Sequence, residues 1–285
     1  MPFWSAGPRR AWPAHAAAFV AAILLVTVAL DAQRGRGGRG GRSRGFAGPR
    51  FAVTEDFDGS FQFCRVVFRP IPGGDGGDWQ VDYPRADQNL SIRLSELTKT
   101  PVSMDEQGNP KPLLVQLSDP VFFRCPFIMM TEVGNIYLDE VESKNLREYL
   151  QKGGFLWADD FWGEYAWQIW ESQIRKVLPT GPYPFVDLPL DHAIFRSVFT
   201  ITRFPQIPSI GAWGGRYGTS ERFDSKVPHA RAILDERQRI MVLITHNTDF
   251  GDSFEREGDN HEYFIEFSVP GYAFGINALI YSMTH

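Results

Sequence analysis

Short runs of apolar residues without polar alternation recur along the chain and predict buried β-strands. The clearest runs are residues 127–130, 155–158 and 240–244. Strands that lack alternation are typical of sheets covered on both faces, as parallel sheets are. Two further runs, residues 61–68 and 113–117, predict additional strands.

Apolar residues at helical spacing lie between these runs and predict helices. We expect one helix capped by Asp87 and further helices over residues 138–151, 164–178 and 271–283. Strands that alternate with helices predict one α/β domain over residues 51–285, with a mostly parallel sheet and helices on both faces. Residues 180–235 are rich in proline and glycine and less regular, so there we expect long loops over one end of the sheet.

The first 50 residues differ from the rest in charge. They hold eight arginines and one acidic residue, a net charge of +7, so the remainder carries 21 basic and 33 acidic residues, or −12. Residues 16–30 are apolar and uncharged and follow Arg9 and Arg10. A membrane-spanning helix needs about 20 apolar residues, whereas a secretory signal needs ~7–15 after a basic flank.

This pattern predicts that residues 1–32 are a signal peptide cleaved after Ala32, or alternatively an uncleaved membrane anchor. Either outcome places the domain in the periplasm, on the inner membrane facing the periplasm, or outside the cell. Residues 33–50 are rich in glycine and arginine, and we expect a disordered linker close to the membrane. Nucleic acid is not an expected partner, because an exported chain rarely meets it.

Acidic and polar residues follow the best-defined strands. Because the carboxyl ends of parallel strands meet at one edge of a sheet, and ligands bind there, these residues are the candidate site: Glu132, Asp159, Asp160, His246, Asn247 and Asp249. Carboxylates with one imidazole could hold a divalent cation or act as acid and base, with Asp159, Asp160 and His246 as the catalytic candidates. No resident cofactor is otherwise indicated. The alternative is structural, since Asp and Asn after a strand often cap the next helix or stabilise a turn.

Other motifs carry weaker signals. Residues 73–78 form a glycine-rich loop, but the dinucleotide-binding pattern fails and no phosphate-binding lysine follows, so a mobile turn is favoured over a nucleotide site. Calcium held by Asp75, Asp78 and Asp82 is a further alternative. The aromatic residues near 157–170 are expected in the core, although Trp162 at a strand mouth could stack on a sugar.

The cysteine content excludes several classes of protein. Two cysteines exclude a disulfide-dense small domain and a zinc site of four thiolates. Neither Cys64 nor Cys125 lies in a strand-to-helix turn, where a nucleophile gains exposure, and no G-x-S-x-G motif is present. In an exported domain the two could form a disulfide or remain buried thiols, and the sequence leaves both open.

Several ordered motifs resemble one bacterial family. They are PFIMMT at 126–131, LREYL at 146–150, GGFL at 153–156 followed by Asp159-Asp160, LDHAIF at 190–195, and GIN at 275–277. Over roughly residues 61–285 the chain resembles DUF4159, a domain of unknown function. That family is similar in fold to class I glutamine amidotransferase-like domains, which implies a three-layer, flavodoxin-like α/β sandwich.

Two departures bear on function. The family often has Thr-Gly-His-Gly where this chain has Thr131-Glu132-Val133-Gly134, which weakens acid–base chemistry at that loop. The wider group places a nucleophilic cysteine after a central strand, and this chain has none, so glutaminase activity is not expected. Asp191 and His192, in a stretch that resembles an Asp-His-Pro-Ile-Phe motif, are additional binding candidates.

Three functions stay open at this point. The favoured one is a non-catalytic module of the cell envelope that binds a polar ligand, a glycan or a partner protein at the strand ends. The second is a hydrolase or metal-assisted enzyme that uses Asp159 or Asp160 with His246. The third is a structural part of an envelope assembly, tethered through residues 1–50.

Overall fold

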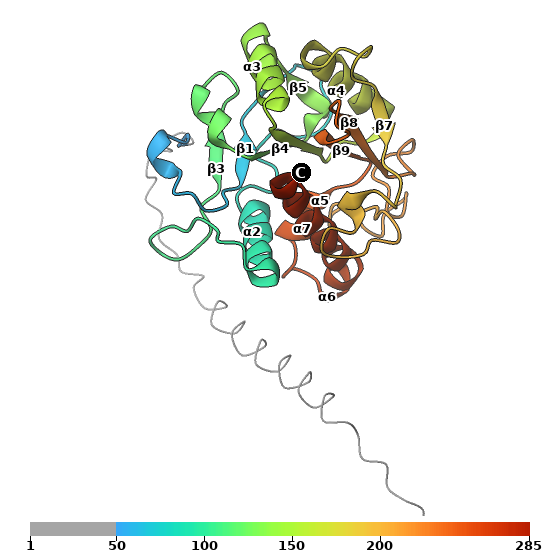
Figure 1. Cartoon of the computed structure of the whole chain (residues 1–285). Coiled ribbons are helices and arrows are strands. Elements are labelled where there is room, and N and C mark those ends of the chain that lie inside the picture. The colour runs from blue at the N-terminus through green and yellow to red at the C-terminus, as the bar shows by residue number, and fades with distance from the viewer. Residues whose placement is uncertain (1–49) are drawn as a thin grey trace, which may run out of the picture. The chain divides into compact units, whose positions relative to one another are not determined.

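A seven-stranded sheet crosses the middle of the protein (Figure 1). A computed structural model describes residues 50–285, so the predicted signal or anchor (1–32) and nearly all of the predicted linker (33–50) lie outside the described residues. The strand order is β3-β1-β4-β6-β9-β8-β7. Their bounds are β1 Cys64–Val66, β3 Leu113–Val115, β4 Phe127–Thr131, β6 Phe155–Asp159, β7 Phe185–Asp187, β8 His229–Leu234 and β9 Ile240–His246.

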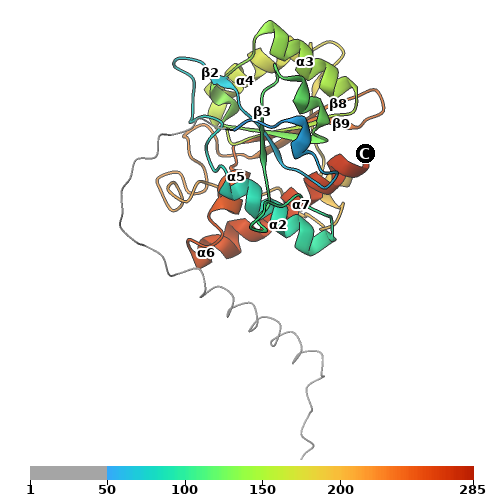
Figure 2. The same cartoon turned by 90° about the vertical axis from the view of Figure 1, so that its left-hand side faces the viewer.

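Helices cover both faces of this sheet, which makes the three-layer α/β fold that the sequence predicts (Figures 1 and 2). One face carries α2 (Arg85–Thr98), α5 (Phe250–Glu255) and α7 (Val269–Thr284). The other face carries α3 (Glu140–Gln151) and α4 (Gly163–Val177). Near α7 lie α6 (His261–Tyr263) and a π-helical turn (Phe264–Ser268), and a small second sheet pairs β2 (Arg69–Pro70) with β5 (Ile136–Tyr137).

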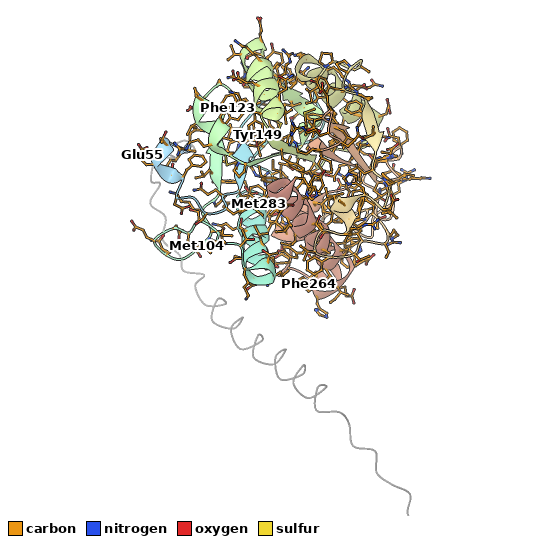
Figure 3. All side chains as sticks on the ribbon, viewed as in Figure 1. Glu55, Met104, Phe123, Tyr149, Phe264 and Met283 are labelled. Carbon is orange, nitrogen blue, oxygen red and sulfur yellow. A yellow bond between two sulfur atoms is a disulfide. The ribbon has the colours of Figure 1, made fainter. Side chains whose placement is uncertain are left out.

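The core consists of two apolar layers, one on each side of the sheet, because successive side chains of a strand point to opposite faces. In β4, Ile128 and Met130 pack toward α3 and α4, whereas Phe127 and Met129 pack toward α2 and α7. Figure 3 shows side chains filling the space between the sheet and the helices; the ring of Tyr149 lies 6.4 Å from that of Phe123. The unalternating apolar runs therefore correspond to strands buried on both faces.

The structure corrects two details of the sequence analysis. Residues 180–235 do not consist only of loops, because they include β7 and β8: β8 pairs antiparallel with β9, and β7 pairs antiparallel with β8 at the edge of the sheet. Asp87 does not cap a helix: α2 already begins at Arg85, and Asp87 is a fully buried ion-pair partner of Arg65. No helix within residues 50–285 is both long and apolar enough to cross a membrane.

Cys64 and Cys125 form a disulfide with a Cα–Cα distance of 6.2 Å. It joins β1 to the residue that precedes the entrance of β4, two strands that are neighbours in the sheet. This resolves the choice between a disulfide and two buried thiols that the sequence leaves open.

The order in which the chain adds strands to the sheet reverses between β1 and β4, which are parallel neighbours. After β1 the chain passes through α2 on one face and returns to the sheet as β3; after β4 it passes through α3 on the other face and returns as β6. The connections that follow β1 and β4 therefore leave the sheet toward opposite faces. Open α/β sheets bind ligands outside the carboxyl ends of the strands at such a point. The fold therefore predicts a ligand-binding site at this edge of the sheet.

Candidate functional site

The parallel strands β4, β6 and β9 bring their carboxyl ends to one edge, as the sequence predicts. Thr131 pairs with Asp159 in register, and the Glu132 N–H donates to the Asp159 carbonyl at 3.1 Å. The first residue after each of these three strands has a positive φ: 56° at Glu132, 55° at Asp160 and 61° at Asn247. This left-handed conformation is uncommon outside glycine, and it turns each side chain away from the direction the strand would give it.

Asp159 anchors the start of α5. Its carboxylate is fully buried and accepts hydrogen bonds from the Thr245 hydroxyl and, at 3.0 Å, from the Phe250 N–H. Burial raises the pKa of Asp159 to about 7. With both oxygens engaged by protein donors, Asp159 has a clear positioning role in the fold.

The centre of the site is a group of three carboxylates, Asp82, Asp160 and Asp249, which we call the carboxylate triad. Oxygens from the three side chains lie within 4.8 Å of one another, and all three residues are buried. Burial, and then repulsion from neighbouring carboxylates, raises the pKa of each well above its ordinary value. None of the three forms an ion pair with a basic side chain within residues 50–285.

Each member of the triad comes from a different strand-end connection. Asp160 follows β6 and accepts from the Trp162 indole N–H at 3.0 Å. Asp249 follows β9 and accepts from the Asp252 N–H at 2.7 Å, capping α5. Asp82 lies in the long connection after β1, and its Oδ2 is buried without a hydrogen-bond partner.

A glycine in α5 makes room for the triad. A Cβ at Gly251 would lie 2.1 Å from Oδ2 of Asp82 and 3.4 Å from Oδ1 of Asp249. Any larger residue would therefore displace the Asp82 carboxylate from its place above the first turn of α5.

Glu132 lies against the glycine-rich loop. A Cβ at Gly76 would lie 1.8 Å from a Glu132 carboxylate oxygen, and the Gly77 N–H donates to this carboxylate. Burial raises the pKa of Glu132 to about 7. Glycine at these positions thus allows the loop to approach a carboxylate, and the negative charge of that carboxylate disfavours a phosphate at this loop.

The glycine-rich loop contacts its surroundings through hydrogen bonds and an ion pair. Asp75 donates its N–H to the Gly134 carbonyl at 3.0 Å and forms an ion pair with Arg222 at 2.7 Å. The Tyr165 hydroxyl donates to the Gly73 carbonyl at 2.9 Å. The predicted calcium set of Asp75, Asp78 and Asp82 is wrong in part, because only Asp82 joins a group of acidic side chains that could hold a metal ion.

His246 does not meet Asp159 as the enzyme hypothesis requires. Alternate residues of β9 point to opposite faces, so Thr245 contacts Asp159 on one face while His246 lies on the other, against the rings of Phe161 and Trp167. Its Nε2 contacts the Gly163 carbonyl at 3.0 Å, and burial lowers its pKa to about 4. His246 is therefore a neutral core histidine in this fold.

Asn247 and Trp162 serve the architecture of the site. The Asn247 side chain accepts from the Gly163 N–H and donates to the Val227 carbonyl, both at 2.8 Å, which fixes two loops at the sheet edge. Trp162 is only 4% exposed, so its ring cannot present a face to a sugar. Its indole instead orients Asp160.

Asp191 and His192 lie at the other end of the sheet. The His192 ring packs 5.6 Å from that of Tyr281, whose hydroxyl accepts from the N–H of Ile240, the first residue of β9. The structure thus separates Asp191 and His192 from the triad, which surrounds the carboxyl end of β9.

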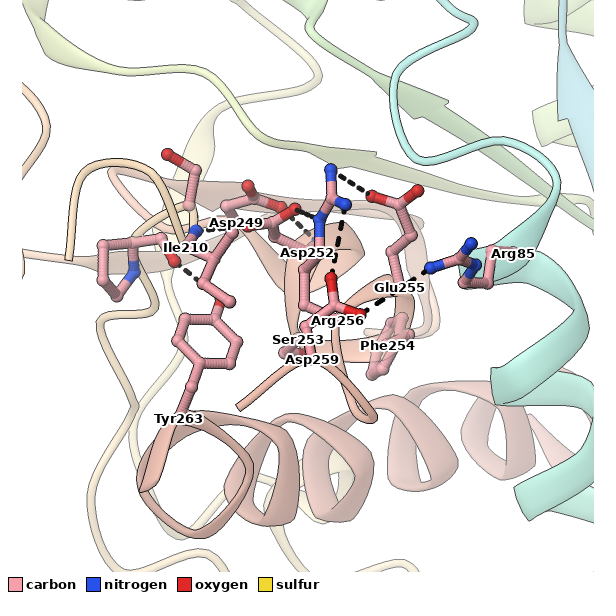
Figure 4. Close-up of polar contacts among 12 residues, drawn as sticks. Arg85, Ile210, Asp249, Asp252, Ser253, Phe254, Glu255, Arg256, Asp259 and Tyr263 are labelled. Atoms are coloured by element: carbon pink, nitrogen blue, oxygen red, sulfur yellow. Dashed lines mark hydrogen bonds and ion pairs between the residues drawn. The ribbon is translucent and has the colours of Figure 1, made fainter. Parts of the chain in front are cut away.

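A second group of acids adjoins the triad but is charge-compensated (Figure 4). Asp82, Asp252 and Glu255 also offer oxygens within 4.8 Å of one another. Arg256, however, forms ion pairs with Asp252 at 3.2 Å and with Glu255 at 2.8 Å. The Arg256 guanidinium therefore compensates the charge of this second group, whereas the carboxylate triad has no such basic partner among residues 50–285.

Arg65 is the other basic group close to the site. Its guanidinium and Asp87 are buried together, with Nε lying 2.9 Å from Asp87 Oδ2 and Nη2 bonded to Oδ1. Its charge acts on Asp82 and Asp159 only from a distance, because the fork of the guanidinium is occupied by Asp87. The bidentate pair therefore does not neutralise the triad.

Sequence reasoning missed Asp82 as a partner of the strand-end acids. One signal was available: Asp82 lies in the connection that follows the first strand, so the same rule that selects Asp160 and Asp249 would also select it. The sequence does not show, however, that this long connection brings Asp82 against the first turn of α5, because that contact forms only in the folded chain.

These features define a class of protein: a three-layer α/β domain with a buried acidic cluster at the carboxyl edge of its parallel strands. Residues 62–283 match the family described as a domain of unknown function, DUF4159, and the chain belongs to that family. The resemblance drawn from the sequence motifs is thereby confirmed. No curated protein matches the sequence significantly.

Proposed function

We propose that this chain is an exported binding module of the cell envelope, and that it takes a positively charged ligand at the carboxylate triad. One observation carries the proposal: three buried carboxylates lie within 4.8 Å of one another and have no basic partner among residues 50–285. Burying a charge is costly unless an opposite charge compensates it. A cationic ligand supplies that compensation.

Two features support export. The apolar run at residues 16–30 follows a basic flank and has the length of a secretory signal. The Cys64–Cys125 disulfide is typical of proteins from oxidising compartments such as the periplasm. The partner that would bind at this site is an envelope protein, or a glycan that carries a bound cation.

Export is tested by expressing the full chain in a bacterial host and determining its N-terminus by mass spectrometry. A mature protein that begins at Gln33 indicates a cleaved signal peptide. Retention of Met1 with recovery in the membrane fraction indicates the anchor. Recovery in the cytoplasm with Met1 and with reduced cysteines would contradict export.

Ligand charge is tested by calorimetric titration of the purified chain with divalent metal ions and, separately, with spermidine. We expect one of these cations to bind at a single site. The double variant Asp160→Asn, Asp249→Asn should lose that binding, while Glu106→Gln, which changes an exposed carboxylate, should retain it. If neither class of cation binds the wild-type chain, the proposal is wrong.

Hydrolytic chemistry is a second candidate, favoured by Glu132 rather than by His246. Glu132 is half-buried, has a pKa of about 7, and is the neighbour that most strongly repels Asp160. A carboxyl group with a pKa near the working pH is suited to general base catalysis. Metal-dependent hydrolysis of chromogenic esters that disappears in Glu132→Gln, with cation binding retained, would favour this candidate over simple binding.

A further inference from the structure

We propose that the cationic ligand is a single divalent metal ion of the hard, oxygen-preferring class, best matched by Ca²⁺, and that Asp82, Asp160 and Asp249 are its protein ligands. This inference rests on the proposed function and names its ligand. The three residues come from the connections after β1, β6 and β9, which meet only in the folded chain.

The spacing of the oxygens suits calcium. Ca²⁺ binds oxygen ligands at about 2.3–2.6 Å, so oxygens on opposite sides of the ion lie up to about 5 Å apart. The triad oxygens lie within 4.8 Å of one another, so they can surround such an ion without a large rearrangement. Mg²⁺ binds at about 2.0–2.1 Å in a stricter octahedral geometry and usually keeps several waters, for which three residues that are 8%, 4% and 3% exposed leave little room.

An independent sign of a ligand is the unpartnered oxygen of Asp82. Its Oδ2 is buried, the residue is only 8% exposed, and no described group donates a hydrogen bond to it. Buried polar atoms in native proteins are nearly always paired, and an exception calls for an explanation such as an ion. Gly251, which leaves space for this oxygen, holds it over the first turn of α5, next to Asp249.

The donor atoms exclude a thiolate- or imidazole-based site. Zinc prefers sulfur and nitrogen ligands, but both cysteines are joined in a disulfide and His246 faces the other side of the sheet. Carboxylates alone are typical of calcium, magnesium and manganese sites.

Burial favours an ion over an organic amine. Asp82, Asp160 and Asp249 are 8%, 4% and 3% exposed. A bare ion needs only the space between their oxygens, whereas a polyamine also needs room for its carbon chain. The neighbouring group with Asp252 and Glu255 is a weaker candidate, because Arg256 already pairs with both residues.

The test uses Tb³⁺, a luminescent substitute for Ca²⁺, with the full purified chain. Trp162 donates to Asp160 at 3.0 Å and is therefore placed to sensitise a bound Tb³⁺ under tryptophan excitation. We expect sensitised emission that saturates at one ion and that Ca²⁺ displaces. Trp162→Phe should lower the emission, and Trp167→Phe, on the other face of the sheet, should leave the emission intact.

Ligand variants decide which group holds the ion. Asp160→Asn and Asp249→Asn should each weaken Ca²⁺ binding by about tenfold or more, since even the loss of an outer-shell partner costs ~10–100-fold. Glu255→Gln, a matched change in the neighbouring acidic group, should alter the affinity less than about threefold. Thermal unfolding in chelator confirms that each variant folds.

The possible failures have separate meanings. Loss of binding in Glu255→Gln with retention in Asp160→Asn would place the ion in the second group and overturn the inference. Binding of spermidine without binding of any metal ion would also overturn it, while the proposed function would stand. Failure of every cation to bind would refute both.

Discussion

Replacing Asp160 by asparagine should stabilise the metal-free protein. The substitution removes one negative charge from the carboxylate triad, and the amide oxygen of asparagine can still accept the hydrogen bond from Trp162. Because the site has no basic partner among the described residues, the wild-type chain has to tolerate this repulsion whenever no cation is bound.

The structure sets the size of the effect. At 4.8 Å, the upper limit on the separation of the triad oxygens, two unit charges repel each other by about 3.5 kcal/mol at an effective dielectric constant of about 20. A proton taken up by the site relieves part of this repulsion, so we expect the free energy of unfolding to rise by about 1–3 kcal/mol at pH 8.

The effect should depend on pH with a definite sign. Burial and repulsion raise the pKa of Asp160 above its ordinary value. Below the ordinary pKa both the native and the unfolded chain carry the proton. As the pH rises, the unfolded chain releases it first, so the native state loses stability until the raised pKa is passed. The gain in Asp160→Asn should therefore be small near pH 4 and largest above neutrality.

Urea unfolding in chelator at pH 4.5 and pH 8 measures this difference, with Glu106→Gln as the control for an exposed carboxylate. Adding Ca²⁺ should stabilise the wild type and not the variant. A variant that is less stable than the wild type at both pH values, or a gain that does not grow with pH, would refute the idea of unneutralised charge in the triad.

Three further results should follow from the structure. Arg65→Met leaves the buried Asp87 without its partner and should cost about 3–5 kcal/mol in urea unfolding, and adding Asp87→Leu should recover much of the loss. Gly76→Ala should destabilise more than Gly108→Ala: both glycines have positive φ, but only the first would bring a Cβ against a carboxylate, so equal losses would count against that contact. His246 stays neutral in the native state with a pKa near 4 instead of 6.5, so stability present above about pH 6.5 should be lost as the pH falls toward 4; His246→Gln should flatten this part of the pH–stability curve.

The apolar runs by themselves determined the centre of the fold. Residues 127–130, 155–158 and 240–244 have no polar position that could face water, so they had to become strands covered on both faces, β4, β6 and β9. The helical spacing between them then required crossover helices and parallel strands. For the same reason the acids after these strands could be placed at one edge of the sheet in advance.

Only the tertiary structure decided which of these acids meet. A left-handed residue after each strand redirects Glu132, Asp160 and Asn247, and strand alternation sends His246 to the face opposite Asp159. Neither effect is visible in composition or spacing, since both depend on where each strand ends.

The triad also depends on contacts between distant parts of the chain. Asp82 reaches Asp160 and Asp249 although 78 and 167 residues separate them along the sequence. Likewise, β7 has only 3 residues, and it is stabilised as a strand by pairing with β8, which in turn pairs with β9. Local preferences specify individual elements, whereas a site built from three connections exists only once the sheet, α2 and α5 have packed together.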